Sequence, residues 1–260
     1  MTDKCRATAQ KLGLFLALAP GVLLIGASPE TQVEQRRVVS LSLDRVRPLA
    51  EAIETLEKRF GWIITYEEPL YVYSGDIVDV AASVRRDGRL SPRIMSATGI
   101  PFNFEYDIPP ERAEPDEETL LRALLDQYHL SGNPGVFSVA HSAYAYHVVP
   151  SRIKNSSGVL ESYHAALDTN ISVPAGGRTV YEMVEAIVRA ATAATDVNMG
   201  VGAIPTNLFF QTRLELSAAT TESARAVLLR TLLATHRKLS WQLLCDPGYK
   251  GCALNIHMVN

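Results

Sequence analysis

The chain has 260 residues, a formal net charge of −3 at pH 7 and 47% hydrophobic side chains. This length accommodates one large or two modest hydrophobic cores. The near balance of charge, slightly acidic, excludes a protein that binds nucleic acid mainly through the phosphate backbone, because such binding depends on a large excess of lysine and arginine.

A hydrophobic segment follows a basic stretch at the start of the chain. Three basic residues precede the apolar run of residues 12–27, and polarity returns directly after it. This order is typical of a secretory signal peptide, which we place at residues 1–28. The run is interrupted by Pro20-Gly21 and is short for a membrane span, which needs about 20 residues. We therefore expect a periplasmic or secreted protein; the alternative is an inner-membrane protein anchored by residues 12–27.

The clearest pattern is a helix followed by a hairpin within residues 223–259. Its helical part carries an apolar stripe, and two alternating strands follow it around a turn rich in glycine and proline. If Cys245 faces Cys252, one register also pairs Leu243 with Leu254, Trp241 with Ile256 and Leu239 with Met258.

This register predicts a disulfide. Cys245 and Cys252 would be exported together, whereas Cys5 precedes the apolar run. Cross-strand partners in a hairpin come within the distance that a disulfide tolerates. The alternative is a pair of free buried thiols. Two cysteines alone do not supply the four ligands of a structural zinc site.

The first half of the exported chain shows one order of elements. We expect a strand at residues 38–43, a helix at 48–60 and a strand at 62–66, and then a strand at 102–106, a helix at 117–130 and a hairpin at 137–149. In this hairpin we expect His141 to face Tyr144. Residues 70–101 interrupt this order as an insertion, which is either a long excursion or a small ribbon. Residues 151–163 are polar and predict a linker.

The second half, residues 164–260, repeats the order. A capping box at Thr179 and Glu182 predicts the start of its first helix. Strands are expected at residues 167–173, 196–201 and 212–217, with residues 207–211 in a loop or continuing a strand. The fold class is therefore α+β, with two tandem βαββαββ modules, at residues 37–150 and 164–260, each with two amphipathic helices packed on a small mixed sheet.

This order of elements resembles the secretin and TonB short N-terminal domain. The similar segments are RPLAEAIETLEKRFGWIITYE in the first half, and TVYEMVEAIVRAA, RLELSAATTESARAVLLRTLLATHRKLSWQLL and CALNIHMV in the second. The resemblance rests on element order and apolar spacing. It implies an interaction or signalling module in the periplasm, whereas family members usually carry this domain in front of a barrel or a secretin ring.

A search for catalytic and ligand-binding patterns finds none. The six histidines lack the spacing of a zinc site and are expected on the surface or near helix ends. No nucleophile elbow or complete nucleotide loop occurs, so we predict no catalytic residue, cofactor or metal. Acidic and aromatic residues are dense around the insertion and form a possible interaction surface, which contains Glu67, Glu68, Tyr71, Tyr73, Asp76 and Asp79.

These patterns favour an exported, non-catalytic protein-interaction or assembly module of the cell envelope. Its expected partner is another envelope protein, which could add a strand at an exposed sheet edge. The alternatives are a periplasmic hydrolase whose groups converge only in the fold, and a small-ligand sensor with a site between the two modules.

Overall fold

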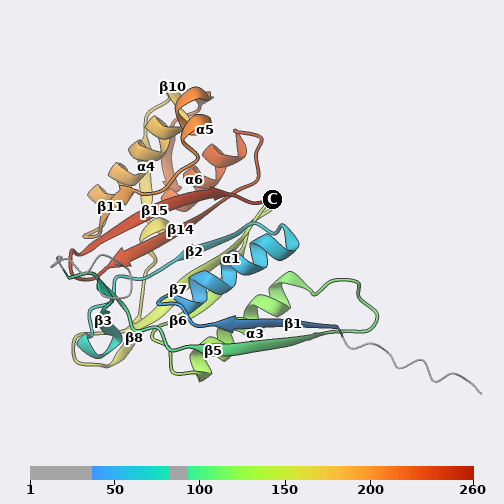
Figure 1. Cartoon of the computed structure of the whole chain (residues 1–260). Helices are drawn as coiled ribbons and strands as arrows, with labels where there is room; N and C mark the ends of the chain where they lie inside the picture. Colours follow the sequence, from blue (N-terminus) through green and yellow to red (C-terminus); the bar gives the residue numbers. More distant parts are fainter. Residues whose placement is uncertain (1–36, 82–92) are drawn as a thin grey trace, which may run out of the picture. The chain divides into compact units, whose positions relative to one another are not determined.

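Figure 1 shows a computed structural model of the chain, which describes residues 37–81 and 93–260. The predicted signal peptide and residues 82–92 of the predicted insertion lie outside the described residues. The described chain combines α-helices with many short strands and is α+β, as expected. None of the helices in this part combines the length and the apolar character needed to cross a membrane.

The first half contains two main helices and a set of strands. Their bounds are β1 (Arg37–Leu43), α1 (Pro48–Phe60), β2 (Ile64–Glu67), the 3₁₀ turn η1 (Ser74–Asp76), β3 (Ile77–Asp79), β4 (Met95–Ala97), β5 (Phe102–Ile108), α3 (Glu117–Leu130), β6 (Val136–His141) and β7 (Tyr146–Lys154). The predicted insertion contributes the ribbon β3–β4, the second of the two forms expected for it.

The second half has a similar series with additional short elements. Their bounds are β8 (Leu160–Ser162), the 3₁₀ turn η2 (Ala166–Asp168), β9 (Asn170–Val173), β10 (Gly176–Thr179), α4 (Val180–Ala194), β11 (Asn198–Val201), α5 (Thr206–Gln211), β12 (Arg213–Leu216), β13 (Ala219–Ser223), α6 (Ala224–Leu233), β14 (Leu239–Asp246) and β15 (Gly251–Met258).

The helix boundaries follow from local chemistry. Proline fits the first turn of α1 because no helical partner exists there for its missing N–H. Gly61 ends α1 with a φ of 68°, a backbone conformation that glycine adopts without a steric cost. The predicted capping box of α4 is confirmed, because the Thr179 hydroxyl accepts from the backbone N–H of Glu182 and the Glu182 carboxylate accepts from the backbone N–H of Thr179.

One sheet of seven strands runs through both halves of the chain. Its order is β11-β15-β14-β2-β7-β6, and β8 pairs with β7. The halves join where β14 runs parallel to β2, with Gln242 beside Tyr66. Four further pairs, β1–β5, β3–β4, β9–β13 and β10–β12, form separate two-stranded sheets.

The helices of the two halves cover opposite faces of this sheet (Figure 1). Tyr66 belongs to the core under α1 and α3, whereas Trp241 belongs to the core under α4 and α6. Gln242 is the direct neighbour of Tyr66 across the strands, and successive residues of a strand point to opposite faces. Trp241 therefore faces away from the core of the first half, and each half has a face that its own helices leave uncovered.

The predicted C-terminal hairpin is confirmed in every pair. Cys245 lies opposite Cys252, Leu243 opposite Leu254, Trp241 opposite Ile256 and Leu239 opposite Met258. The two cysteines form a disulfide, with their Cα atoms 3.9 Å apart. Alternating apolar residues on both strands specify this register because one face of the hairpin is buried.

The register predicted for the first hairpin is wrong. His141 pairs with Tyr146 and not with Tyr144, so the turn holds four residues in place of two. Ser142 is the reason: its backbone N–H donates to the Ala145 carbonyl at 3.0 Å, and its hydroxyl accepts from the Ala145 N–H at 3.2 Å. These bonds stabilise the wider turn.

The predicted linker also has a different structure, because β7 continues through Pro150 to Lys154 and turns back into β8. Burial of Ile153 beside Tyr71 supports this extension. The strand tolerates Pro150 next to a register irregularity in β6.

Two further differences lie before the final helix. Residues 206–211 form helix α5, which buries Phe209 completely, and not a loop or strand. The strand directly before α6 is β13, which pairs with β9; the predicted strand at residues 212–217 is β12, which pairs instead with β10.

Candidate functional site

Two buried glutamates lie where the two halves meet, at the end of β2. Glu67 is 1% exposed and forms an ion pair with Arg225 of α6, while its other oxygen accepts the Leu167 N–H at 3.2 Å. Arg225 Nε also lies 2.6 Å from Asp168. Burial raises the pKa of the Glu67 carboxyl, and Arg225 opposes this shift by stabilising the charged form.

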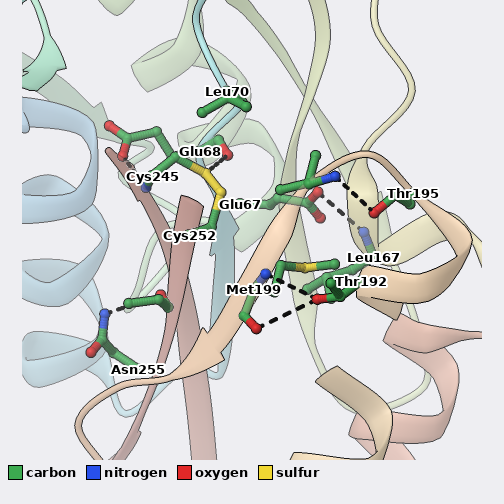
Figure 2. Close-up of a disulfide and its surroundings, with 12 residues drawn as sticks. Glu67, Glu68, Leu70, Leu167, Thr192, Thr195, Met199, Cys245, Cys252 and Asn255 are labelled. Carbon is green, nitrogen blue, oxygen red and sulfur yellow. Dashed lines mark hydrogen bonds between the residues drawn. A yellow bond between two sulfur atoms is a disulfide. The ribbon is translucent and has the colours of Figure 1, made fainter. Parts of the chain in front are cut away.

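Glu68 forms a second connection, beside the disulfide (Figure 2). Its carboxylate accepts from Arg47 Nε at 2.9 Å and from the Cys245 N–H at 2.8 Å. Arg47 also donates to the Cys245 carbonyl at 2.9 Å. Burial raises the pKa of Glu68, and Arg47 again opposes the shift. The residues before α1, the end of β2 and the end of β14 are therefore held together.

The predicted interaction surface is wrong as a single surface. Four of its six residues are buried, namely Glu67, Glu68, Tyr71 and Asp76. These side chains are buried because each has a partner inside the protein. The two glutamates pair with arginines. The Tyr71 hydroxyl donates to the Pro134 carbonyl at 2.9 Å, and Asp76 lies 2.8 Å from Lys154 Nζ. Tyr73 is half-buried under the same Lys154, and Asp79 is exposed.

The histidine prediction fails for one of the six residues, His147, whereas the side chain of His257 is 35% exposed. His147 is buried, with Nδ1 2.7 Å from the Thr65 hydroxyl and Nε2 3.1 Å from the Ser142 hydroxyl. His257 Nε2 lies 2.7 Å from a carboxylate oxygen of the buried Glu57. The contacts with Thr65 and Glu57 join elements that are far apart in the sequence, so no local spacing indicates them.

His147 predicts a pH dependence of stability. Burial lowers its pKa to about 4, and Arg225 contributes to the shift. A histidine in an unfolded chain has a pKa of about 6.5, so acidification from pH 6.5 to 4 protonates the unfolded chain before the folded one. This difference lowers the free energy of unfolding by about 3 kcal/mol across that window, and above pH 6.5 the neutral His147 contributes its full stabilisation. Urea unfolding at pH 7 and pH 4 is expected to show this loss.

A matched substitution isolates the histidine. His147→Gln retains hydrogen-bonding groups but does not titrate, so its free energy of unfolding should depend less on pH than that of the parent, whereas the exposed His129→Gln should behave like the parent. This comparison is needed because Glu67 and Glu68, with raised pKa values, act in the opposite direction. An identical pH slope in the His147 variant would contradict the assignment.

A groove of about 480 Å³ lies between the start of α1 and the sheet face that α4 and α6 leave uncovered. Its lining comes from both halves of the chain: Asp44, Arg45, Val46, Arg47, Ala50, Glu51, Glu54, Gln242 and Leu244. Gln242 links the halves directly by donating to the Ala50 carbonyl at 3.2 Å. Because the lining depends on this contact, the shape of the groove depends on the junction of the two halves.

The groove combines apolar and charged side chains. Ala50 is buried and Leu244 is partly buried, whereas Asp44 and Arg45 are exposed. Arg45 Nε lies 3.1 Å from Glu51, and Lys58 Nζ lies 2.9 Å from Glu54, whose pKa this bond lowers. Protein-binding surfaces also combine apolar side chains with polar and charged ones.

A second hollow, of about 410 Å³, has aromatic walls. It is lined by Phe60, Gly61, Trp62, Ile63, Glu117, His141, Ala143, Tyr144, Ala145, Tyr146 and Lys238. Phe60 and Trp62 stack with ring centroids 4.4 Å apart, and His141 and Tyr146 lie 4.6 Å apart. Lys238 comes from the second half, so this hollow too lies between the halves. We define it as the aromatic hollow.

Sequence reasoning missed both the groove and the aromatic hollow. The signal available for the hollow was the density of aromatic residues in two short segments, Phe60–Trp62 and 141–146, but nothing local places these segments together. Among residues 37–81 and 93–260, no cluster of three or more histidine, cysteine or acidic side chains could hold a metal ion.

The comparisons with known proteins identify no relative. No family model, curated protein or solved structure matches this chain.

Proposed function

We propose that this chain is an exported, non-catalytic binding module that contacts another protein of the cell envelope. In this proposal the halves are two tandem modules that resemble the secretin and TonB short N-terminal domain. The envelope location follows from the predicted signal peptide and is supported by the Cys245–Cys252 disulfide, since disulfides persist in oxidising compartments.

The strand pairings support the proposed duplication. In the first half β1 pairs antiparallel with β5, β2 runs parallel to β7, and β6 and β7 form a hairpin. In the second half the same relations hold between β9 and β13, β11 and β15, and β14 and β15. In this proposal each half uses one order of strand, helix and pairing, with β3, β4, β8, β10, β12 and α5 as additions.

The groove beside α1 is the observation that carries the proposal. It is lined by both halves, combines apolar with charged side chains, and includes Arg47, which pairs with the buried Glu68. Arg47 and Glu68 both hydrogen bond to the backbone of Cys245 in the second half, which fixes the arrangement of the halves, so a partner would meet a preformed surface. Preformed surfaces bind with a smaller loss of conformational entropy.

Site-specific photo-crosslinking in cells that produce the protein tests this function. A photoreactive residue at Arg45 or at Glu54, both in the groove, is expected to capture the same envelope protein. The exposed Arg122 on α3 is the control position. A further position, the exposed Ser138 on the edge strand β6, tests whether a partner adds a strand to the sheet. Equal labelling from the groove and from Arg122 would reject the proposal.

A small-ligand site is the second candidate function. The aromatic hollow favours it, because pockets of about 300–1,000 Å³ with aromatic walls and a few polar groups are typical of small-molecule sites. Its polar groups include Glu117 of α3, His141 of β6 and Lys238, which precedes β14. This site is separate from the groove, so the two functions can be tested independently.

A further inference from the structure

The aromatic hollow is built by turns that are distant in the sequence. Phe60 ends α1 and Trp62 lies in the connection to β2, whereas Tyr144 lies in the turn between β6 and β7 and Tyr146 begins β7. Tyr144 is 63% exposed although it is large and apolar over most of its surface. This exposure leaves the ring of Tyr144 accessible to a ligand in the hollow.

Three carboxylates lie at the start of α3, and one of them, Glu117, lines the hollow. Asp116 and Glu118 pair with Arg112 and Arg122, respectively. Glu117, in contrast, lines the hollow beside Tyr146 and forms no ion pair among the residues that the structure describes. It is therefore a carboxylate in the lining without an ion-pair partner among the described residues, and the basic side chains of the same lining are His141 and Lys238.

The titration of the neighbouring groups reflects this negative charge. Burial raises the pKa of Glu117, which indicates that the pocket penalises its charged form. The pKa of Tyr146 is also raised, by burial first and then by the charges of Glu117, Asp116 and Glu118. A positively charged ligand would relieve the cost of burying the Glu117 carboxylate.

We infer that the aromatic hollow binds a small organic cation, of the alkylated-ammonium class, between the rings of Tyr144 and Tyr146 and the carboxylate of Glu117. The faces of aromatic rings attract cations, and an alkylated ammonium group also gains from apolar contact with the rings. A neutral ligand would not compensate the carboxylate. Lys238 is the opposing charge at the rim, and it weakens this binding. The inference rests on the second candidate function and does not involve the groove.

Titration of the purified exported chain with choline tests the ligand class, with 3,3-dimethylbutan-1-ol as its neutral isostere. The indole N–H signal of Trp62 reports on the hollow by NMR, and that of the fully buried Trp241 serves as an internal reference. We expect a saturable shift at Trp62 alone and an affinity for choline about tenfold above that for the isostere.

Four single variants define the site. Glu117→Gln is expected to weaken choline binding about fivefold and Tyr144→Ala about threefold, whereas Lys238→Met strengthens it about twofold, since it removes a repulsive charge. Tyr249→Ala, at an exposed tyrosine outside the hollow, is the matched control and should bind as the parent does. Thermal unfolding checks that each variant is folded.

Three results would overturn the inference. Equal affinity for choline and its isostere would mean that charge is not recognised, and an unchanged affinity in Glu117→Gln would remove the assigned carboxylate. If glucose saturates the Trp62 shift and choline does not, the ligand class is wrong while a small-ligand site remains. No saturable shift with any of the three compounds rejects both the inference and the second candidate function.

Discussion

Replacing Arg225 by alanine is expected to lower the free energy of unfolding by about 3–5 kcal/mol, because it leaves the buried carboxylate of Glu67 without its cation. Glu67 is 1% exposed and would keep only the Leu167 N–H as its described hydrogen-bond donor. Urea unfolding followed by circular dichroism measures the loss. The removal of a buried partner costs more than the pair itself contributes, since the remaining charge cannot be solvated.

A double variant separates the unpaired charge from lost packing. Glu67→Gln combined with Arg225→Met keeps an acceptor for the Leu167 N–H and removes both charges, so it should recover most of the stability lost in Arg225→Ala. The exposed pair of Arg122 and Glu118 is the control, and Arg122→Ala is expected to change the free energy of unfolding by less than about 1 kcal/mol. If Arg225→Ala costs no more than Arg122→Ala, the pair does not hold the halves together.

Truncation of Trp241 is the second large expected effect. Trp241 is completely buried in the core under α4 and α6, and its ring centroid lies 5.8 Å from that of His147 in the other half. Trp241→Ala should therefore lower the free energy of unfolding by about 3–5 kcal/mol, through lost burial and the remaining cavity. Because Trp241 is beside the junction, both halves should unfold in one transition at lower urea.

Trp241→Phe tests the polar part of this side chain. The indole Nε1 is buried and has no hydrogen-bond partner among the described residues, so its removal eliminates an unsatisfied donor. We expect the phenylalanine variant to lose less than about 2 kcal/mol, well below the alanine variant. Tyr249→Ala, on the exposed turn of the same hairpin, should have little effect. A similar loss in the phenylalanine and alanine variants would contradict this account.

The C-terminal hairpin was predictable because its information is local. Two strands with alternating apolar residues and a short turn allow one register that buries one face, and the disulfide follows from that register. The first hairpin has the same alternation, but its register depends on the Ser142 hydroxyl, whose bonds stabilise a wider turn. Turns of two and four residues differ little in energy, and the pattern of apolar residues does not indicate which of them forms.

The candidate sites were not predictable for a related reason. Glu67 and Glu68 follow a strand and have the charge expected of surface residues, but Arg225 lies 158 residues further along the chain than Glu67. Only the pairing of β2 with β14 brings α6 and the segment before α1 to these carboxylates. The groove and the aromatic hollow depend on the same junction, since both are lined by residues of the two halves.

The sequence by itself therefore determined the class of fold, most of the helices and strands, and the pairing of Cys245 with Cys252, because each depends on the spacing of apolar residues along a short segment. The tertiary structure alone decided that one sheet joins the halves and that their helices cover opposite faces. It also decided which charges are buried and where the hollows lie. These properties arise from contacts between segments far apart in the chain, for which periodicity along the sequence carries no information.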